Sequence, residues 1–224
     1  MSDVKSFNNF KIHTQYSICE GAIKIDDLKN YCKDNKILNI GICDSYNLCG
    51  ALEFAEKVSK SGTQPIIGTQ INFFLDNIIG KLPLFSTSSL GYKNLIKLSS
   101  KSYLESDEKS DPHCKISVLK DINKDLILLS GNQYGFFGQL FKKNKIKQIE
   151  QLIEELKNIF KDRFYFEIQR HNEPGEENFE NFIIELSKNF EIPLIASQEI
   201  FYLTKDMYEA HDALVCIGQK NFIN

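Results

Sequence analysis

Short apolar runs bounded by turn residues alternate along this chain with segments of helical periodicity. The alternation restricts the fold, because it is typical of parallel strands joined by crossover helices. It predicts strands at residues 37–43, 65–74, 82–85, 126–130, 164–169 and 192–196. We therefore expect one α/β domain over residues 1–224, in which a closed or nearly closed barrel is favoured over an open sheet.

The expected helices carry their apolar residues in single stripes. The clearest stripe lies at 146–160, and a second lies at 179–190. Further helices are expected at 25–32, 48–58 and 207–215. Only residues 105–111 are polar enough to form a long exposed loop, and no repeat or linker divides the chain. The glycine patterns of dinucleotide-binding and P-loop folds are absent from the sequence.

The charge and the cysteine content limit the classes of protein that the sequence fits. The formal net charge is −3, which disfavours a self-sufficient nucleic-acid-binding module, and the basic stretch at 142–147 is interpreted as a solvated loop leading into a helix. The six cysteines form no C-x-x-C pair, and no Cys/His cluster has zinc spacing. Residues 1–5 lack the apolar core of a signal peptide, and no run of about 18 apolar residues occurs in the sequence. We expect a reduced, cytoplasmic location and no membrane.

In β/α barrels the functional side chains lie at the carboxyl ends of the strands. Those ends carry His13, Gln15, Asp44, Ser45, Gln70, Asn132, Arg170, His171 and Glu199. A hydrolytic metal centre needs several imidazoles and carboxylates in one cluster. The chain has four histidines, and two of them, His113 and His211, are expected away from these ends. The predicted rim is therefore short of metal ligands.

Nucleophilic catalysis finds little support in the sequence. Ser130-Gly131 follows a predicted strand, but a G-x-S-x-G motif is missing and no histidine is placed to serve this serine. Cys43 precedes Asp44 at another strand end, where we interpret it as a buried core thiol.

Several blocks resemble the PHP (polymerase and histidinol phosphatase) domain of bacterial DNA polymerase III alpha subunits. They are FKIHTQYSICEGAIKIDDL at 10–28, LNIGICDSYNLCGALEF at 38–54, QPIIGTQINF at 64–73, GYKNLIKLSSKSY at 91–103, LILLSG at 126–131 and IPLIASQEIFYL at 192–203, with a closing block at 210–217. The resemblance implies a distorted seven-stranded (β/α) barrel. It also implies that the chain is an N-terminal fragment of a longer polymerase.

The family's metal ligands, carried over by position, fall on Lys11, His13, Glu20, Asp44, Ser45, Gln70, Lys81, Asn132, Glu199 and Phe201. By this resemblance His13 and Asp44 are unchanged ligands, whereas Lys11, Ser45, Gln70, Lys81 and Phe201 replace histidines or a glutamate. An ammonium group binds no metal, so Lys11 and Lys81 imply a vestigial pocket in which lysines neutralise the remaining carboxylates. We expect no catalytic residue, no bound metal and no other cofactor in this domain.

Three functions follow from the resemblance. The favoured one is an inactive scaffold that stabilises the polymerase and docks the proofreading exonuclease subunit. The others are an active metal-dependent 3′–5′ exonuclease or phosphoesterase, which would bind zinc or manganese, and a free-standing small-molecule phosphatase. The whole protein would be a DNA-directed DNA polymerase, a nucleotidyltransferase of DNA replication. It would use magnesium and reach DNA through its polymerase part.

Overall fold

The computed structural model describes residues 7–106 and 110–222. The chain divides into two compact units. The first comprises residues 1–44, 49–67 and 198–224, and the second comprises residues 45–48 and 68–197. Strand β3 (Gln64–Leu75) belongs to both, because the boundary falls between Ile67 and Gly68.

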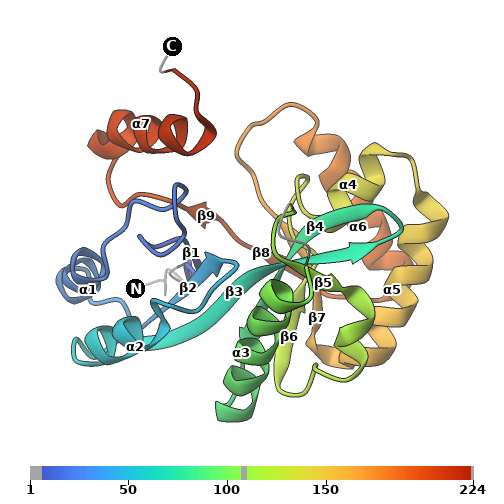
Figure 1. The fold of residues 1–224 in the computed structure, drawn as a ribbon, viewed down its shortest axis with the longest axis horizontal. Coiled ribbons are helices and arrows are strands. Elements are labelled where there is room, and N and C mark those ends of the chain that lie inside the picture. Colours follow the sequence, from blue (N-terminus) through green and yellow to red (C-terminus); the bar gives the residue numbers. More distant parts are fainter. Residues whose placement is uncertain (1–6, 107–109, 223–224) are drawn as a thin grey trace, which may run out of the picture. The chain divides into compact units, whose positions relative to one another are not determined.

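The first unit is built on short parallel strands (Figure 1). β1 (Lys11–Ile12) pairs with both β2 (Asn39–Ser45) and β9 (Glu199–Ile200) and is parallel to each. The helices α1 (Ile25–Asp34) and α2 (Ala51–Ser59) contact each other. Their inward side chains join those of the strands in one apolar core, which is made of Ile12, Ile23, Ile25, Leu28, Cys32, Ile40, Ile42, Phe54 and Val58. This core fixes β1, which carries the first candidate site residues.

Helix α7 (Tyr208–Gln219) follows a short 3-10 turn (Lys205–Met207) in the same unit. None of its residues is buried. Gly218 packs against the loop after β1, because a Cβ added there would lie 2.4 Å from the Cβ of Cys19. Over the described part of the chain, no helix is both long and apolar enough to cross a membrane.

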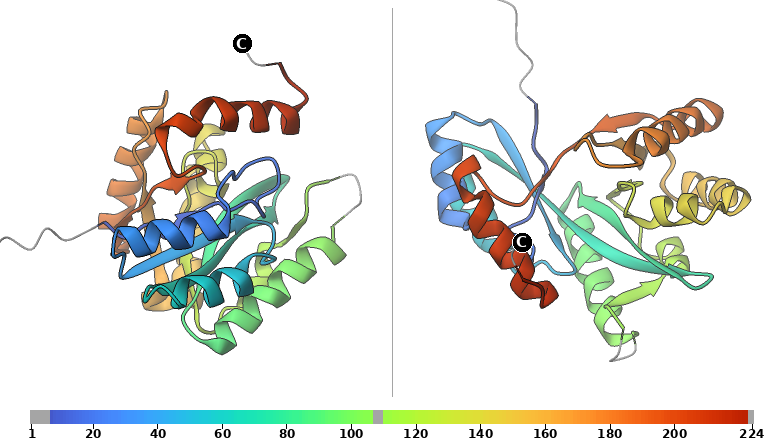
Figure 2. Two further views of the ribbon diagram at one scale, coloured as in Figure 1. Left: turned by 90° about the vertical axis from the view of Figure 1, so that its left-hand side faces the viewer. Right: turned by 90° about the horizontal axis from the view of Figure 1, so that it is seen from above.

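The strands of the second unit follow the order β8-β7-β6-β4-β3, with β5 paired to β3. The strands besides β3 are β4 (Ile78–Ser86), β5 (His113–Lys115), β6 (Leu126–Leu129), β7 (Phe164–Ile168) and β8 (Leu194–Ala196). The helices are α3 (Ser89–Leu104), α4 (Phe136–Lys142), α5 (Ile146–Phe160) and α6 (Glu176–Phe190), with short 3-10 turns at Ile116–Lys120 and Lys161–Arg163. α3 packs on β4 and β6, whereas α5 and α6 pack on β7 (Figure 2).

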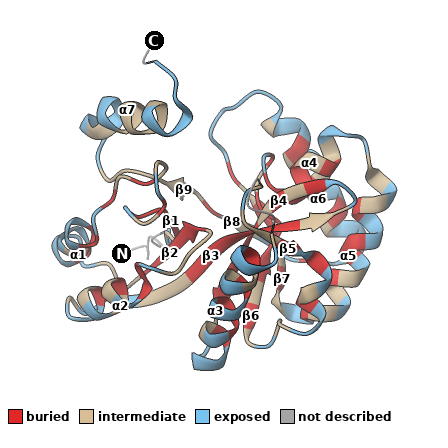
Figure 3. Ribbon diagram, viewed as in Figure 1, coloured by how far each residue is buried: buried red, intermediate tan, exposed pale blue. Residues whose placement is uncertain are grey.

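The apolar stripe expected at 146–160 is confirmed. α5 buries the residues of that stripe while its other face remains exposed (Figure 3). The buried members are Ile149, Leu152, Ile153, Leu156 and Phe160. Burying such a stripe supplies most of a helix's stability, since short helices are marginal in water by themselves.

One strand departs from the parallel pattern. β4 is antiparallel to both of its neighbours, β3 and β6. The two residues between β3 and β4 are Asp76 and Asn77, with φ values of 48° and 64°. A two-residue loop with both φ values positive is a type I′ hairpin turn, and a loop this short joins only antiparallel strands. Residues 65–74 and 126–130 were expected to be parallel strands, and this expectation is wrong where β3 and β6 pair with β4.

The mixed α/β class is confirmed, and each of the six expected strands is present. The described residues form nine strands, which are the six expected ones and the short strands β1, β5 and β9 that the apolar pattern did not predict. Helices α3 and α4 were not expected either. The polar loop expected at 105–111 lies partly outside the described residues.

Candidate functional site

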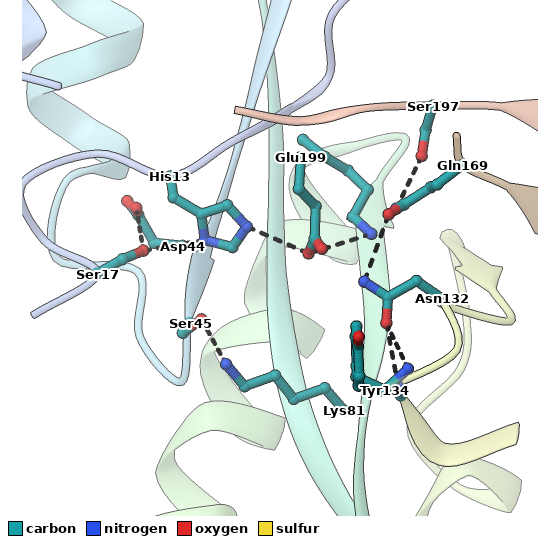
Figure 4. A network of polar contacts seen from close by, with 12 residues as sticks. His13, Ser17, Asp44, Ser45, Lys81, Asn132, Tyr134, Gln169, Ser197 and Glu199 are labelled. Atoms are coloured by element: carbon teal, nitrogen blue, oxygen red, sulfur yellow. Dashed lines mark hydrogen bonds and ion pairs between the residues drawn. The ribbon is translucent and has the colours of Figure 1, made fainter. Parts of the chain in front are cut away.

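The pairing of β1 with β9 brings three predicted site residues together in the first unit. Lys11 lies opposite Glu199 in the strand register, and His13 lies two residues further along the chain on the same face as Lys11. Lys11 Nζ lies 3.4 Å from Glu199 Oε1. His13 Nε2 also lies 3.4 Å from Glu199 Oε1 (Figure 4). The side chains of Lys11 and His13 are 1% exposed and that of Glu199 is 13% exposed. The glutamate is therefore a largely buried anion held between two basic groups.

Asp44 lies at the end of β2 and is also buried. Its Oδ1 accepts a hydrogen bond from Thr14 N at 2.6 Å and one from Ser17 Oγ at 2.7 Å. Its Oδ2 accepts one from Thr14 Oγ1 at 2.8 Å. Three hydrogen bonds compensate much of the cost of burying a carboxylate. Sequence reasoning missed the roles of Thr14 and Ser17, although both are polar residues close to His13 in the sequence.

The same residues form a Ser-His-Glu array that the sequence did not predict. His13 Nδ1 lies 3.3 Å from Ser17 Oγ, and Nε2 of the same ring faces Glu199. A nucleophilic serine must be open to substrate and must pass its proton to the imidazole. Ser17 is fully buried and donates its hydroxyl proton to Asp44 (Figure 4). Ser17 therefore acts as a hydrogen-bond donor to the Asp44 carboxylate and not as a nucleophile.

An aromatic ring covers His13. The Phe201 ring stacks on the imidazole with a centroid separation of 4.4 Å and an interplanar angle of 15°. Phe201 also stacks on His211, whose Nε2 lies 2.8 Å from the carbonyl oxygen of Glu20 and donates to it. His211 was expected away from the rim, and the structure places it on α7 in contact with the backbone of a predicted site residue.

The second unit contains the other predicted positions. Lys81 Nζ donates to Ser45 Oγ at 3.1 Å (Figure 4). The same Nζ lies 4.8 Å from the centroid of the Tyr46 ring. Tyr46 has a φ of 68°, and its amide donates to the Gln70 carbonyl oxygen at 2.8 Å. Ser99 Oγ donates to the Tyr46 carbonyl oxygen at 3.0 Å. Hydrogen bonds to the amide and the carbonyl group of Tyr46 thus hold the segment that presents Ser45 to Lys81.

Asn132 organises the loop after β6. Its Oδ1 accepts from the amides of Tyr134 at 2.9 Å and Gly135 at 3.1 Å, and its Nδ2 donates to Gln169 Oε1 at 3.3 Å. Gln169 Nε2 in turn donates to Glu167 Oε1 at 2.7 Å and to Ser197 Oγ at 3.1 Å. Ser197 also donates to Glu167. The ends of β6, β7 and β8 are therefore linked by amide and hydroxyl groups and by the Glu167 carboxylate.

Arg170 and His171, which were expected at the strand ends, and His113, which was expected in a loop, lie in three different environments. His171 Nε2 lies 3.3 Å from Gln169 Oε1 and joins the Asn132 network. The Arg170 side chain is 74% exposed and pairs with Glu180. His113, on β5, has its Nδ1 2.8 Å from the carbonyl oxygen of Asp111. Within residues 7–106 and 110–222, no three His, Cys, Asp or Glu side chains are grouped so that they could hold a metal ion.

The sequence profile of the PHP domain family matches residues 9–171, so the chain belongs to this family. Over 95% of its length the chain is 34% identical to the DNA polymerase III subunit alpha of Rickettsia bellii. It is 32% identical over its full length to the DNA polymerase III subunit alpha of Caulobacter vibrioides. The chain spans 18% and 20% of these two relatives, or about a fifth of their length.

Solved structures support the same fold. The chain superimposes on a protein assigned as a metal-dependent phosphoesterase from Bifidobacterium adolescentis with a TM-score of 0.56. The alignment covers 87% of both chains at 10% sequence identity. The superposition establishes a common fold. Because the identity is so low, the chemistry has to be argued from the residues themselves.

Proposed function

We propose that this chain is a metal-free PHP domain that acts as a structural part of a DNA polymerase III alpha subunit in bacterial DNA replication. The ion pair between Lys11 and Glu199 carries the proposal. In the family pattern both residues occupy ligand positions, and here the lysine supplies the positive charge that a metal ion would supply. A buried carboxylate needs such a partner, because an unpaired buried charge is costly.

The remaining donors fit a divalent ion poorly. Binding at Glu199 would require the ion to displace Lys11 or to lie beside its ammonium group, and like charges at that distance repel strongly. Asp44 already accepts three hydrogen bonds, and the position expected for a histidine is the phenyl ring of Phe201. Lys81, bound to Ser45, adds a second ammonium at a ligand position in the other unit. We derive no catalytic step through a metal here.

The proposed partners follow from the relatives. They are DNA polymerase III alpha subunits about five times as long as this chain. We propose that the domain packs against the remainder of such a subunit, offers a surface to the proofreading exonuclease subunit, and leaves the DNA that is copied to the polymerase part of the complete subunit. That polymerase would be a cytoplasmic DNA-directed nucleotidyltransferase, whose magnesium would belong to its polymerase part.

Hydrolysis assays test the proposed lack of activity. The chain is incubated with single-stranded DNA or with a chromogenic phosphate monoester, each with added manganese or zinc. No turnover above background is expected, since water activation in this fold needs a metal that lowers the pKa of the bound water. Metal-dependent turnover that His13→Ala abolishes would replace the scaffold proposal with an active exonuclease or phosphoesterase.

Reversion gives the complementary experiment. The combined substitutions Lys11→His, Ser45→His, Gln70→Glu, Lys81→His and Phe201→His should restore metal binding before activity. Affinity depends on the number of ligands, whereas turnover also needs surrounding groups that hold those ligands in place. Single reversions should have almost no effect, because one added imidazole still faces a lysine. Metal binding by a single reversion would show that the lysines do not block the site.

Docking of the exonuclease is tested separately. A labelled proofreading exonuclease subunit from the same bacterium is titrated with this chain, and albumin serves as the negative control. Saturable binding supports the docking role, whereas binding that requires the complete alpha subunit would place the docking surface elsewhere.

A further inference from the structure

The turn between α4 and α5 carries an uncompensated positive charge. Residues 134–149 contain four lysines and no aspartate or glutamate, in a chain whose net charge is −3. These are Lys142, Lys143, Lys145 and Lys147, of which all but Lys145 are exposed. Among the residues that the structure describes, no carboxylate lies within ion-pair distance of these four, whereas Lys57, Lys101 and Lys120 each have an acidic partner.

The lysine-bearing turn has a defined backbone. Asn144 has a φ of 53°, which is the left-handed conformation that often ends a helix. The amides of Asn144 and Lys145 donate to the carbonyl oxygens of Phe141 at 2.8 Å and Leu140 at 3.0 Å. The Phe141 ring stacks on Phe182 of α6 with a centroid separation of 4.6 Å. Ligand binding at these lysines therefore costs less conformational entropy than it would at lysines on a flexible loop.

An exposed aromatic ring lies beside the turn. The Tyr134 side chain is 55% exposed, and Lys142 Nζ lies 4.2 Å from the centroid of its ring. The Tyr134 hydroxyl donates to Glu173, and its amide donates to Asn132 Oδ1 at 2.9 Å. The hydrogen bond to Glu173 raises the pKa of Tyr134, so the ring carries no charge at neutral pH. The nearby carboxylates of Glu173 and Glu176 both raise this pKa, so the ring has acidic neighbours as well as Lys142.

We propose that Tyr134 and the lysines at 142, 143, 145 and 147 form a binding surface for single-stranded nucleic acid. Lysines close together in the chain can each bind a backbone phosphate, and an exposed aromatic ring can stack on an unpaired base. A duplex fits less well, because its bases are already stacked on one another and cannot reach Tyr134. This surface requires neither a metal nor a reaction, so it goes beyond the scaffold function proposed above.

Fluorescence anisotropy with a labelled oligothymidylate of about 20 nucleotides tests the surface. The 224-residue chain should bind it saturably at low salt, and log K should fall with log[salt] with a slope of roughly −2 to −3 for four phosphate contacts. The triple variant Lys142→Ala/Lys143→Ala/Lys147→Ala should weaken binding by about tenfold or more. The control triple Lys24→Ala/Lys33→Ala/Lys60→Ala removes the same charge from exposed positions elsewhere and should change it by less than about twofold.

Substitutions of Tyr134 separate stacking from charge. Tyr134→Phe keeps the ring and should retain binding, whereas Tyr134→Ala should weaken it by about fivefold or more. Far-UV circular dichroism confirms that each variant is folded. No binding by the unaltered chain, equal losses in the two lysine triples, or equal affinity for a duplex of the same length would each overturn the proposal.

Discussion

Replacing Lys11 by methionine probes the buried ion pair directly. The change keeps most of the side-chain volume and removes the positive charge 3.4 Å from Glu199 Oε1. At an effective dielectric constant of about 20, two unit charges at that distance attract each other by about 5 kcal/mol. Relief of the desolvation of the ammonium and the remaining contact with His13 offset part of this loss. We expect Lys11→Met to lower the free energy of unfolding by about 3 kcal/mol.

A double-mutant cycle isolates the pair. Glu199→Gln by itself should also destabilise the chain, because it leaves the Lys11 ammonium buried beside a neutral amide. The double variant Lys11→Met/Glu199→Gln should cost less than the sum of the single variants by roughly 2 kcal/mol. Lys57→Met, in the exposed ion pairs with Asp26 and Glu53, is the reference and should have a smaller effect.

Urea unfolding followed by circular dichroism gives the free energies, and equal m values among the variants show that the comparison is sound. Two results would refute the reasoning. One is a Lys11→Met variant as stable as the unaltered chain. The other is a double variant whose loss equals the sum of the two single losses, since additivity means that the two groups do not interact.

Three further predictions concern other parts of the chain. Asp44→Asn should lower the free energy of unfolding by about 2–4 kcal/mol in urea titrations, because an amide nitrogen would replace one of the acceptor oxygens facing Thr14 and Ser17; an unchanged midpoint would contradict the hydrogen bonds described. Asn77→Gly should raise the midpoint of thermal unfolding, because glycine adopts the positive φ of the hairpin turn without steric cost; a lower midpoint would contradict the turn assignment. Burial raises the pKa of the Cys114 thiol from 9.0 to about 12, so at pH 8 a thiol reagent should modify the exposed Cys49 and spare Cys114 until the chain is unfolded. The pKa of Cys114 is higher in the folded chain than in the unfolded chain. The stability that the neutral thiol contributes should therefore be present below pH 9.0 and should decline as the pH rises above that value.

Local periodicity predicted much of the fold. The apolar runs at 126–130 and 164–169 became β6 and β7, and the stripe at 146–160 became α5. Strands β1 and β9 have two residues each, which is too short for any period to be visible. Helix α3 was missed because its apolar positions are interrupted by serines and lysines. Its N-cap could have indicated it, since Ser88 Oγ accepts from the amides of Leu90 and Gly91.

The sequence predicted which residues belong to the candidate site, but not which of them contact one another. The resemblance identified Lys11 as a residue at a former ligand position and led us to expect a carboxylate beside it. In the structure Lys11 pairs with Glu199. That pair is separated by 188 positions, and only the pairing of β1 with β9 brings it together. Lys81 donates to Ser45 Oγ, a bond that spans 36 positions. Spacing along the sequence carries no signal for such long-range contacts.

Metal content tests most directly whether Lys11 replaces a metal ion. The chain is purified without chelator, analysed by elemental mass spectrometry and then titrated with zinc and manganese in a calorimeter. We predict far less than one ion per chain and no saturable heat, because each ion would have to displace the ammonium from Glu199. Stoichiometric metal that is lost in both His13→Ala and Asp44→Ala would contradict the proposal and identify a working metal centre.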